Sequence, residues 1–322
     1  MARPTYTPSQ ITAIYDRISL PPQHRHLPGN DTNTLTHSLE TGLPLLSVLQ
    51  KQHITSIPFE NLSLHYSPTK TIHPDPTLLF DKIVTQSTGR GGYCMENNLF
   101  FATLLRSLGF WVMSTGARVN AATPADAEKG VTQKFTGWSH MINIVTFDGG
   151  RRFMVDVGFG AGQATHPVEL VDCVASLNIA PTQSVRVRWG SLEENENADS
   201  KLWIFEKQDE PEGRWSANYC FPDCLEFLPQ DFEVANHFTS TARTSFFTYR
   251  IMVVKFLMDE GEVVGTVVLV GNKAHRRVGG VKEELGTFET EEERVSALEK
   301  WFGIRLDGVQ RGAIEGMVSA LG

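Results

Sequence analysis

Residues 90–98, Arg-Gly-Gly-Tyr-Cys-Met-Glu-Asn-Asn, predict a tight turn that leads into a helix beginning at Cys94. The two glycines permit the turn and a close approach of neighbouring backbone. Apolar residues then recur at helical spacing, and the pattern stops at Gly109. Backbone N–H groups and the helix dipole favour negative charge at a helix start, so Cys94 is a candidate thiolate nucleophile. A buried structural cysteine fits the same short motif, so the rest of the chain must decide.

A predicted β-hairpin supplies a base and a carboxylate. Residues 139–147 and 152–157 have the pattern of two strands, and Asp148-Gly149-Gly150 between them is a turn signal. A turn centred on its first residue places His140 opposite Asp156, and a centre one residue later makes the two diagonal neighbours. In either register the carboxylate of Asp156 lies within roughly 5–8 Å of the backbone of His140, close enough for a side-chain hydrogen bond. The hairpin therefore predicts an imidazole base whose orientation is fixed by a carboxylate.

Cys94, His140 and Asp156 together predict a core like that of cysteine proteases. The thiolate would attack a carbonyl, the imidazole would take and return protons, and the carboxylate would stabilise the imidazolium. A thiol also suits transfer from a thioester, because one thiolate expels another of similar basicity and the exchange is nearly isoenergetic. An amine can then capture the acyl group as a more stable amide.

Longer motifs around these three residues resemble the arylamine N-acetyltransferase family, in a member of fungal type. The matching segments are 90–98, Ser-His-Met-Ile-Asn-Ile-Val at 139–145, Val-Asp-Val-Gly-Phe-Gly at 155–160, Ile-Pro-Phe-Glu-Asn-Leu at 57–62 and Asn-His-Phe-Thr-Ser-Thr at 236–241. Their order and spacing agree with the family from about residue 10 to about residue 270. The resemblance implies acetyl transfer from acetyl-coenzyme A to arylamines and arylhydrazines through an acyl-Cys94 intermediate, by ping-pong kinetics.

The resemblance also implies where the substrates bind. At the family's offset from the catalytic histidine, Thr136 and Gly137 are expected to contact the coenzyme, although an ordinary turn at the start of a strand fits them too. Phe59 is expected to line the pocket for the aryl group. Phe159 is expected to line the same pocket, with core packing as the other interpretation. No metal is expected, and the partners are the acyl-coenzyme A co-substrate and a small arylamine.

Arg243 marks a departure from the family pattern. Many relatives have His-Pro or Ser-Pro after the Ser-Thr pair, whereas this chain has Ala242-Arg243. Some fungal-type relatives prefer malonyl to acetyl donors, and the planar arginine cation suits a carboxylate. If this loop faces the acyl donor, Arg243 would bind the free carboxylate of malonyl-coenzyme A. A contact with coenzyme phosphates, or plain surface exposure, is the alternative.

Composition excludes several other classes of function. The chain has 322 residues and a formal net charge of −8, which argues against nucleic acid as a partner. No apolar run approaches ~20 residues, so no membrane span is expected. Four cysteines and a start without a signal-peptide pattern favour the reducing cytoplasm. Cys220 and Cys224 lack a convincing second pair of metal ligands.

The change of pattern along the chain predicts an α+β fold of several domains. Residues 1–109 are expected to form a helical bundle that carries Cys94, and a capping box at Thr7 starts its first helix. Residues 110–221 are expected to form a β-barrel that carries His140 and Asp156. Residues 222–322 are expected to form an α/β lid, with a second capping box at Thr290. The same three-part arrangement is implied by the family resemblance.

Two rival functions use the same three residues. A thiol hydrolase of papain or transglutaminase type would act on peptides or amides without an acyl-coenzyme A donor, and only the longer motifs favour transfer. A non-catalytic small-molecule binder on the same scaffold is the third interpretation. Rapid alkylation of Cys94 at neutral pH, blocked by acyl donor, would contradict that third interpretation.

Overall fold

The computed structural model describes residues 3–29, 32–179 and 181–322. Its α-helices are α1 (Pro8–Arg17), α2 (Thr32–His37), α3 (Leu39–Ser56), α4 (Ser63–Tyr66), α5 (Pro76–Phe80), α6 (Cys94–Ser107), α7 (Pro124–Glu128), α8 (Pro229–Thr241), α9 (Glu291–Ala297) and α10 (Gly308–Gly312). Its shorter 3₁₀ or π segments are η1 (Pro22–His24), η2 (Asp81–Thr85), η3 (Asp148–Gly150), η4 (Phe246–Thr248) and η5 (Leu298–Phe302).

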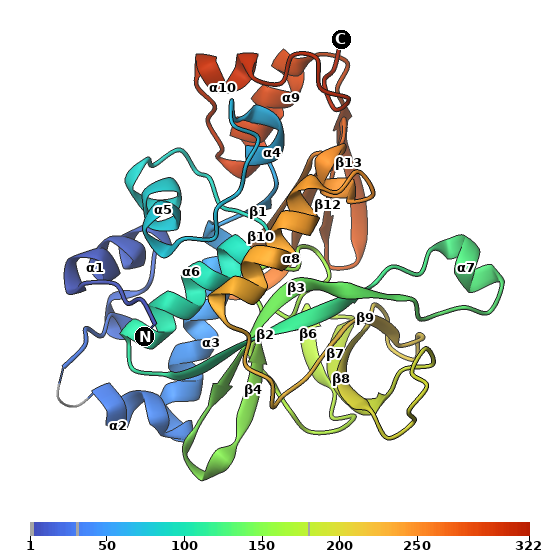
Figure 1. Cartoon of the computed structure of the whole chain (residues 1–322). Coiled ribbons are helices and arrows are strands. Elements are labelled where there is room, and N and C mark those ends of the chain that lie inside the picture. The colour runs from blue at the N-terminus through green and yellow to red at the C-terminus, as the bar shows by residue number, and fades with distance from the viewer. Residues whose placement is uncertain (1–2, 30–31, 180) are drawn as a thin grey trace.

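The strands are β1 (Phe59–Glu60), β2 (Trp111–Asn120), β3 (Phe135–Thr146), β4 (Arg152–Val155), β5 (Val168–Glu169), β6 (Ser176–Ile179), β7 (Gln183–Ser191), β8 (Lys201–Gln208), β9 (Ser216–Phe221), β10 (Met252–Asp259), β11 (Glu262–Val270), β12 (Lys273–Val278) and β13 (Val281–Thr287). Within the described residues they form one sheet of eight strands and one of five. Figure 1 shows the N-terminal helices on one side of the larger sheet, and α9 and α10 beside the smaller sheet near the C-terminus.

The capping signals start the helices where the sequence predicts. The Thr7 side chain accepts a hydrogen bond from the Gln10 N–H, and Gln10 Oε1 accepts one from the Thr7 N–H at 2.9 Å. The Thr290 side chain likewise accepts from the Glu293 N–H at the start of α9. Each pair satisfies backbone donors that the first turn of a helix leaves free.

The eight-stranded sheet curls into a nearly closed barrel, in the order β5-β4-β3-β2-β9-β8-β7-β6. The segment after β5 reaches β7, because the Cys173 N–H donates to the Val187 carbonyl at 2.8 Å. Buried aromatic and β-branched side chains fill the barrel interior: Ile142, Ile144, Val185, Val187, Phe205, Tyr219 and Phe221.

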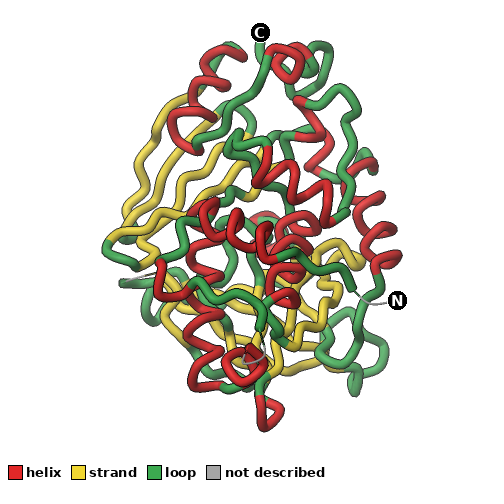
Figure 2. The backbone as a smooth tube through the Cα atoms, turned by 90° about the vertical axis from the view of Figure 1, so that its left-hand side faces the viewer, coloured by secondary structure: helices red, strands yellow, loops and turns green. Residues whose placement is uncertain are grey.

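The five-stranded sheet joins the two ends of the chain, in the order β1-β10-β11-β12-β13. Its first strand comes from the N-terminal third, and Phe59 pairs with Val254. One face packs on the C-terminal helices through Val253 and Leu269, and the other enters the central core through Val254 and Val268. Figure 2 shows the two sheets in separate parts of the molecule, with helices packed between and beside them. Among the described residues, none of the helices combines the length and the hydrophobicity that a bilayer span requires.

Candidate active site

Cys94 is the first residue of α6, as its sequence predicts. The turn before it packs tightly, since a Cβ on Gly91 would lie 2.0 Å from the Pro58 carbonyl oxygen. The turn is also hydrogen-bonded to β1 through the Glu60 N–H and the Gly92 carbonyl, at 2.9 Å. The helix ends at Ser107, and Gly109 follows with a φ of 90° that few other residues adopt. These contacts fix the thiol at the start of the helix.

The hairpin brings His140 against Asp156. Asn143 pairs with Val155, which centres the hairpin on Gly149 and makes the histidine and aspartate diagonal neighbours, the second of the two predicted registers. The ladder ends at Val155, and the side chains meet beyond it, with His140 Nε2 2.7 Å from Asp156 Oδ2. Both side chains are almost completely buried. The predicted contact between imidazole and carboxylate is therefore present.

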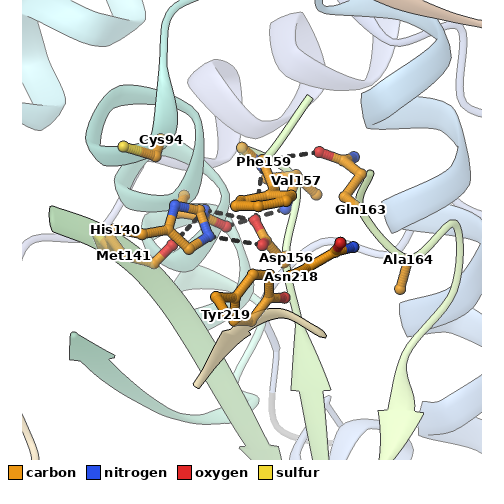
Figure 3. A network of polar contacts seen from close by, with 12 residues as sticks. Cys94, His140, Met141, Asp156, Val157, Phe159, Gln163, Ala164, Asn218 and Tyr219 are labelled. Carbon is orange, nitrogen blue, oxygen red and sulfur yellow. Dashed lines mark hydrogen bonds and ion pairs between the residues drawn. The ribbon is translucent and has the colours of Figure 1, made fainter. Parts of the chain in front are cut away.

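Cys94 lies on the other side of the imidazole from the carboxylate. Figure 3 shows the His140 ring between Cys94 and Asp156, with the thiol turned away from the ring in this view. The Sγ atom is 3.8 Å from the carbonyl oxygen of Ser139 and only 4% of the residue is exposed. Because Nε2 binds the carboxylate, Nδ1 is the ring nitrogen that can form a hydrogen bond with a third group.

Burial and charge oppose each other at this pair. Burial lowers the pKa of His140, but the charge and hydrogen bond of Asp156, together with Cys94, outweigh it and raise the pKa to about 10. Burial raises the pKa of Asp156, yet the His140 charge and hydrogen bonds from His140, Asn98 and Gly158 bring that pKa below its usual value. The site therefore stabilises an imidazolium beside a carboxylate at neutral pH.

Asn98 ties the helix to the hairpin, a role that was not predicted from the sequence. Its Nδ2 donates to Asp156 Oδ1 at 2.9 Å and to the Met141 carbonyl at 2.7 Å. Its Oδ1 accepts from the Val157 N–H at 3.0 Å. Its position four residues after Cys94 places it on the same face of the helix, but no local pattern in the sequence indicates its contact with Asp156.

Gly158 permits the closest approach between the two parts of the site. A Cβ at this position would lie 2.8 Å from the Cα of Cys94 and 2.8 Å from Asn98 Nδ2. Such distances exclude any side chain unless the backbone moves. The Gly158 N–H also donates to Asp156 Oδ1 at 2.8 Å.

A buried cluster of charges supports the turn before Cys94. Arg90 donates from Nε to Glu60 at 2.8 Å, so it organises the turn. Lys82 lies 3.5 Å from Glu60 and 2.8 Å from Glu96. Glu96 in turn accepts from the Tyr93 N–H at 3.1 Å. Burial opposes ionisation of Glu60, but the charges of Arg90 and Lys82 outweigh burial and lower its pKa to about 2.

Aromatic rings surround the imidazole. Phe159 meets His140 edge-on, with ring centroids 5.1 Å apart, and Tyr219 lies 5.0 Å from the same ring. Figure 3 shows Phe159 and Tyr219 on either side of the region that contains Asp156. Phe59, also expected to line the pocket, is 6% exposed in the central core. Tyr219 was not identified from the sequence.

A groove of about 650 Å³ lies between β3 and α8 and reaches Ser139, beside the thiol. Apolar side chains dominate its lining: Trp138, Leu225, Phe227, Val234, Ala235 and Phe238. Gly137 lies at the groove and is exposed, with no other atom within 4 Å of where a Cβ would stand. Thr136 is partly buried, and its hydroxyl lies 2.8 Å from Ser139 Oγ. Of the two expected coenzyme contacts, Gly137 thus lines a groove that reaches Ser139, and Thr136 precedes it in the chain.

Arg243 follows the last turn of α8 and is exposed.

Within the described parts of the chain, no group of three His, Cys, Asp or Glu side chains could hold a metal ion. The four cysteines are all free thiols in the structure, and Cys94 and Cys220 are buried.

Comparison with known proteins gives a consistent result. A family model described as N-acetyltransferase matches residues 42–311. The N-malonyltransferase FDB2 of Gibberella moniliformis is 36% identical over 327 residues, which covers 97% of this chain and 93% of the relative.

Solved structures share the α+β fold over nearly the whole chain. The arylamine N-acetyltransferase of Nocardia farcinica is 28% identical with a TM-score of 0.73, covering 98% of this chain and 97% of that one. The Mycobacterium marinum arylamine N-acetyltransferase in complex with CoA is 25% identical with a TM-score of 0.73, covering 96% and 98%.

Proposed function

The chain belongs to the arylamine N-acetyltransferase family and is an acyl-CoA-dependent N-acyltransferase, and from that premise we propose its substrates and its mechanism. It transfers an acetyl, malonyl or propionyl group from acyl-CoA to arylamines and arylhydrazines, with an acyl-Cys94 intermediate. The observation that carries the mechanism is the 2.7 Å contact between His140 and Asp156, with Cys94 across the ring at the start of α6.

In the first half-reaction His140 takes the thiol proton at Nδ1, and the Cys94 thiolate attacks the thioester carbonyl. A rotation about the Cα–Cβ bond of Cys94 brings Sγ toward the ring, since the thiol has other staggered positions. The carbon–sulfur bond to coenzyme A breaks, and the imidazolium returns its proton to the leaving thiolate. The raised pKa of His140 favours the imidazolium that this step creates.

In the second half-reaction the amine attacks the acyl-Cys94 carbonyl. The imidazole accepts the proton that the nitrogen loses, the carbon–sulfur bond to Cys94 breaks, and the amide leaves. The proton on His140 then restores the thiol. Asp156 holds Nε2 in both halves, so that the same ring nitrogen faces the reacting groups throughout.

The substrates approach through the groove between β3 and α8. Thr136 and Gly137 contact the coenzyme, and the apolar lining receives its pantetheine arm. Phe59 and Phe159 bound the pocket for the aryl group of the acceptor, beside the imidazole. We place the reaction in the cytoplasm, where a reducing environment keeps Cys94 a thiol.

The malonyl donor is proposed from the likeness to a malonyltransferase, and Arg243 is the candidate contact for its free carboxylate. The test compares malonyl and acetyl transfer by the wild type and by Arg243→Ala. A selective loss of malonyl transfer supports the pairing. An equal loss for both donors indicates a phosphate contact, and no change contradicts any role in donor binding.

The acyl-enzyme is tested by intact mass after mixing with acetyl-, propionyl- or malonyl-CoA in the absence of an amine. We expect a single adduct on the wild type, none on Cys94→Ser, and loss of the adduct with amide formation when an arylamine is added. An adduct that persists on Cys94→Ser would overturn the mechanism. Peptide cleavage without acyl-CoA would favour a thiol hydrolase instead.

A further inference from the structure

Arg118 stacks on Trp138, which lines the groove between β3 and α8. They are cross-strand partners on β2 and β3, and the guanidinium carbon lies 4.3 Å from the centre of the indole ring. The stack holds the planar cation in one orientation over the ring. Trp138 itself lines the groove, so this cation stands at a groove wall.

The backbone of β3 is accessible next to this pair. The pairing of β2 with β3 passes from Trp138 to Phe135 and skips Thr136 and Gly137, so β3 has a bulge there. Gly137 is exposed, and no atom other than those of its neighbours lies within 4 Å of where its Cβ would stand. A ligand can therefore approach the backbone beside Arg118.

The groove needs a cation if it receives a coenzyme. The charged side chains that line it are the carboxylates Glu226 and Asp231, and the chain as a whole carries a formal charge of −8. Phosphate groups would be repelled by this field without local positive charge. Arg3 cannot supply that charge freely, because it already binds Glu226 at 3.0 Å.

Arg118 is available for such a role. Its Nη1 lies 3.4 Å from the Thr136 carbonyl, and the described residues provide no carboxylate within ion-pair distance. It is also partly exposed. A guanidinium with free donors binds a phosphate by two parallel hydrogen bonds, which a carbonyl contact does not replace.

We propose that Arg118, held by Trp138, binds a phosphate group of acyl-CoA while the pantetheine arm lies in the groove toward Cys94. This inference rests on the proposed function, because it assigns the recognition of the same donor. It makes Arg118 a binding residue for the nucleotide end of the donor, remote from the bond that breaks.

The test distinguishes the contribution of the phosphates to donor binding from the reaction of the thioester. Acetyl-CoA and S-acetylpantetheine carry the same acetyl thioester, but only the first has the phosphates. For Arg118→Gln we expect the KM for acetyl-CoA to rise about tenfold with little change in kcat, since a hydrogen bond to a charged group is lost. The kcat/KM for S-acetylpantetheine should stay near that of the wild type, which also shows that the variant is folded.

Arg186 provides a matched control. It stacks on Trp215 at 4.2 Å, as Arg118 does on Trp138, but it is paired with Glu206 at 2.8 Å. Arg186→Gln should leave the KM for acetyl-CoA unchanged. Dephospho-CoA as the donor identifies the phosphate: if Arg118 binds the 3′-phosphate, the variant and the wild type should use acetyl-dephospho-CoA equally well.

The outcomes distinguish this inference from the proposed function. A wild type that forms no acyl-enzyme with acetyl-CoA refutes the proposed function. If the wild type forms the acyl-enzyme, but Arg118→Gln has the same KM for acetyl-CoA as the wild type, only the role of Arg118 is refuted. An equal fall in kcat/KM with S-acetylpantetheine would also overturn the role of Arg118, because the effect of the substitution would not depend on the phosphates.

Discussion

Replacing Asn98 by alanine should weaken both the fold and the reaction, because one amide joins α6 to both sides of the hairpin. The change removes three hydrogen bonds: to Asp156, to the Met141 carbonyl and from the Val157 N–H. At about 1 kcal/mol for each bond, the free energy of unfolding should fall by about 3 kcal/mol. Urea denaturation followed by circular dichroism measures this loss.

The same change should alter catalysis and its pH dependence. Asp156 keeps the donors His140 and Gly158 but loses the amide, so the pKa of its carboxyl rises. We expect kcat/KM to fall by at least about tenfold, since small displacements of reacting groups are costly. The acid-side decline of activity should move to higher pH.

Asn97→Ala is the matched control, one residue earlier on the same buried helix. Its amide makes one longer bond, 3.3 Å to the Pro58 carbonyl, and its Oδ1 is buried without a partner. This variant should lose about 1 kcal/mol or less and keep most of the activity. Equal stability losses in the two variants, or full activity in Asn98→Ala, would refute the reasoning.

Three further variants test other parts of the structure. Cys94→Ser should lose nearly all acyl transfer while its melting temperature stays close to that of the wild type, and substantial turnover would remove Cys94 as the nucleophile. Gly158→Ala should lose more activity than Gly312→Ala, because only the first places a Cβ 2.8 Å from the Cα of Cys94; equal activities would contradict the close approach. Burial, and then the charge of Arg17, lower the pKa of His53 to about 3, and both its ring nitrogens lack partners. The neutral ring stabilises the fold above the ordinary pKa of about 6.5, and this contribution is lost as the pH falls toward about 3. Melting temperatures of His53→Leu should therefore decline less than those of the wild type below pH 6.5, and parallel curves would show that His53 does not contribute.

The elements that carry local signals were predictable from the sequence. The helix after Cys94 has a glycine turn before it and an apolar stripe within it, and the two capping boxes define the starts of α1 and α9. The hairpin register was narrowed to two choices by its turn. Each choice kept His140 near Asp156, so the contact could be predicted although the register could not.

Other elements were missed because their signals are not local. β12 and β13 are rich in charged residues and largely exposed, so they lack the alternation of a half-buried strand. β1 has two residues, and its partner β10 lies far along the chain, which no local pattern reveals. Asn98 has an ordinary helical position, and only the packed structure shows that its amide meets Asp156. The division of the chain into three domains stays a prediction.

The short strand β1 also sets the order in which the protein can be completed during synthesis. β1 holds the turn before Cys94 on one side and pairs with β10 on the other, and Asn61 is bonded to Met252, 191 positions later. A ribosome must therefore make most of the chain before the support of this turn is complete. Closing so long a loop is slow compared with local folding. Cys94 thus acquires its final surroundings late, after the barrel that carries His140 has been synthesised.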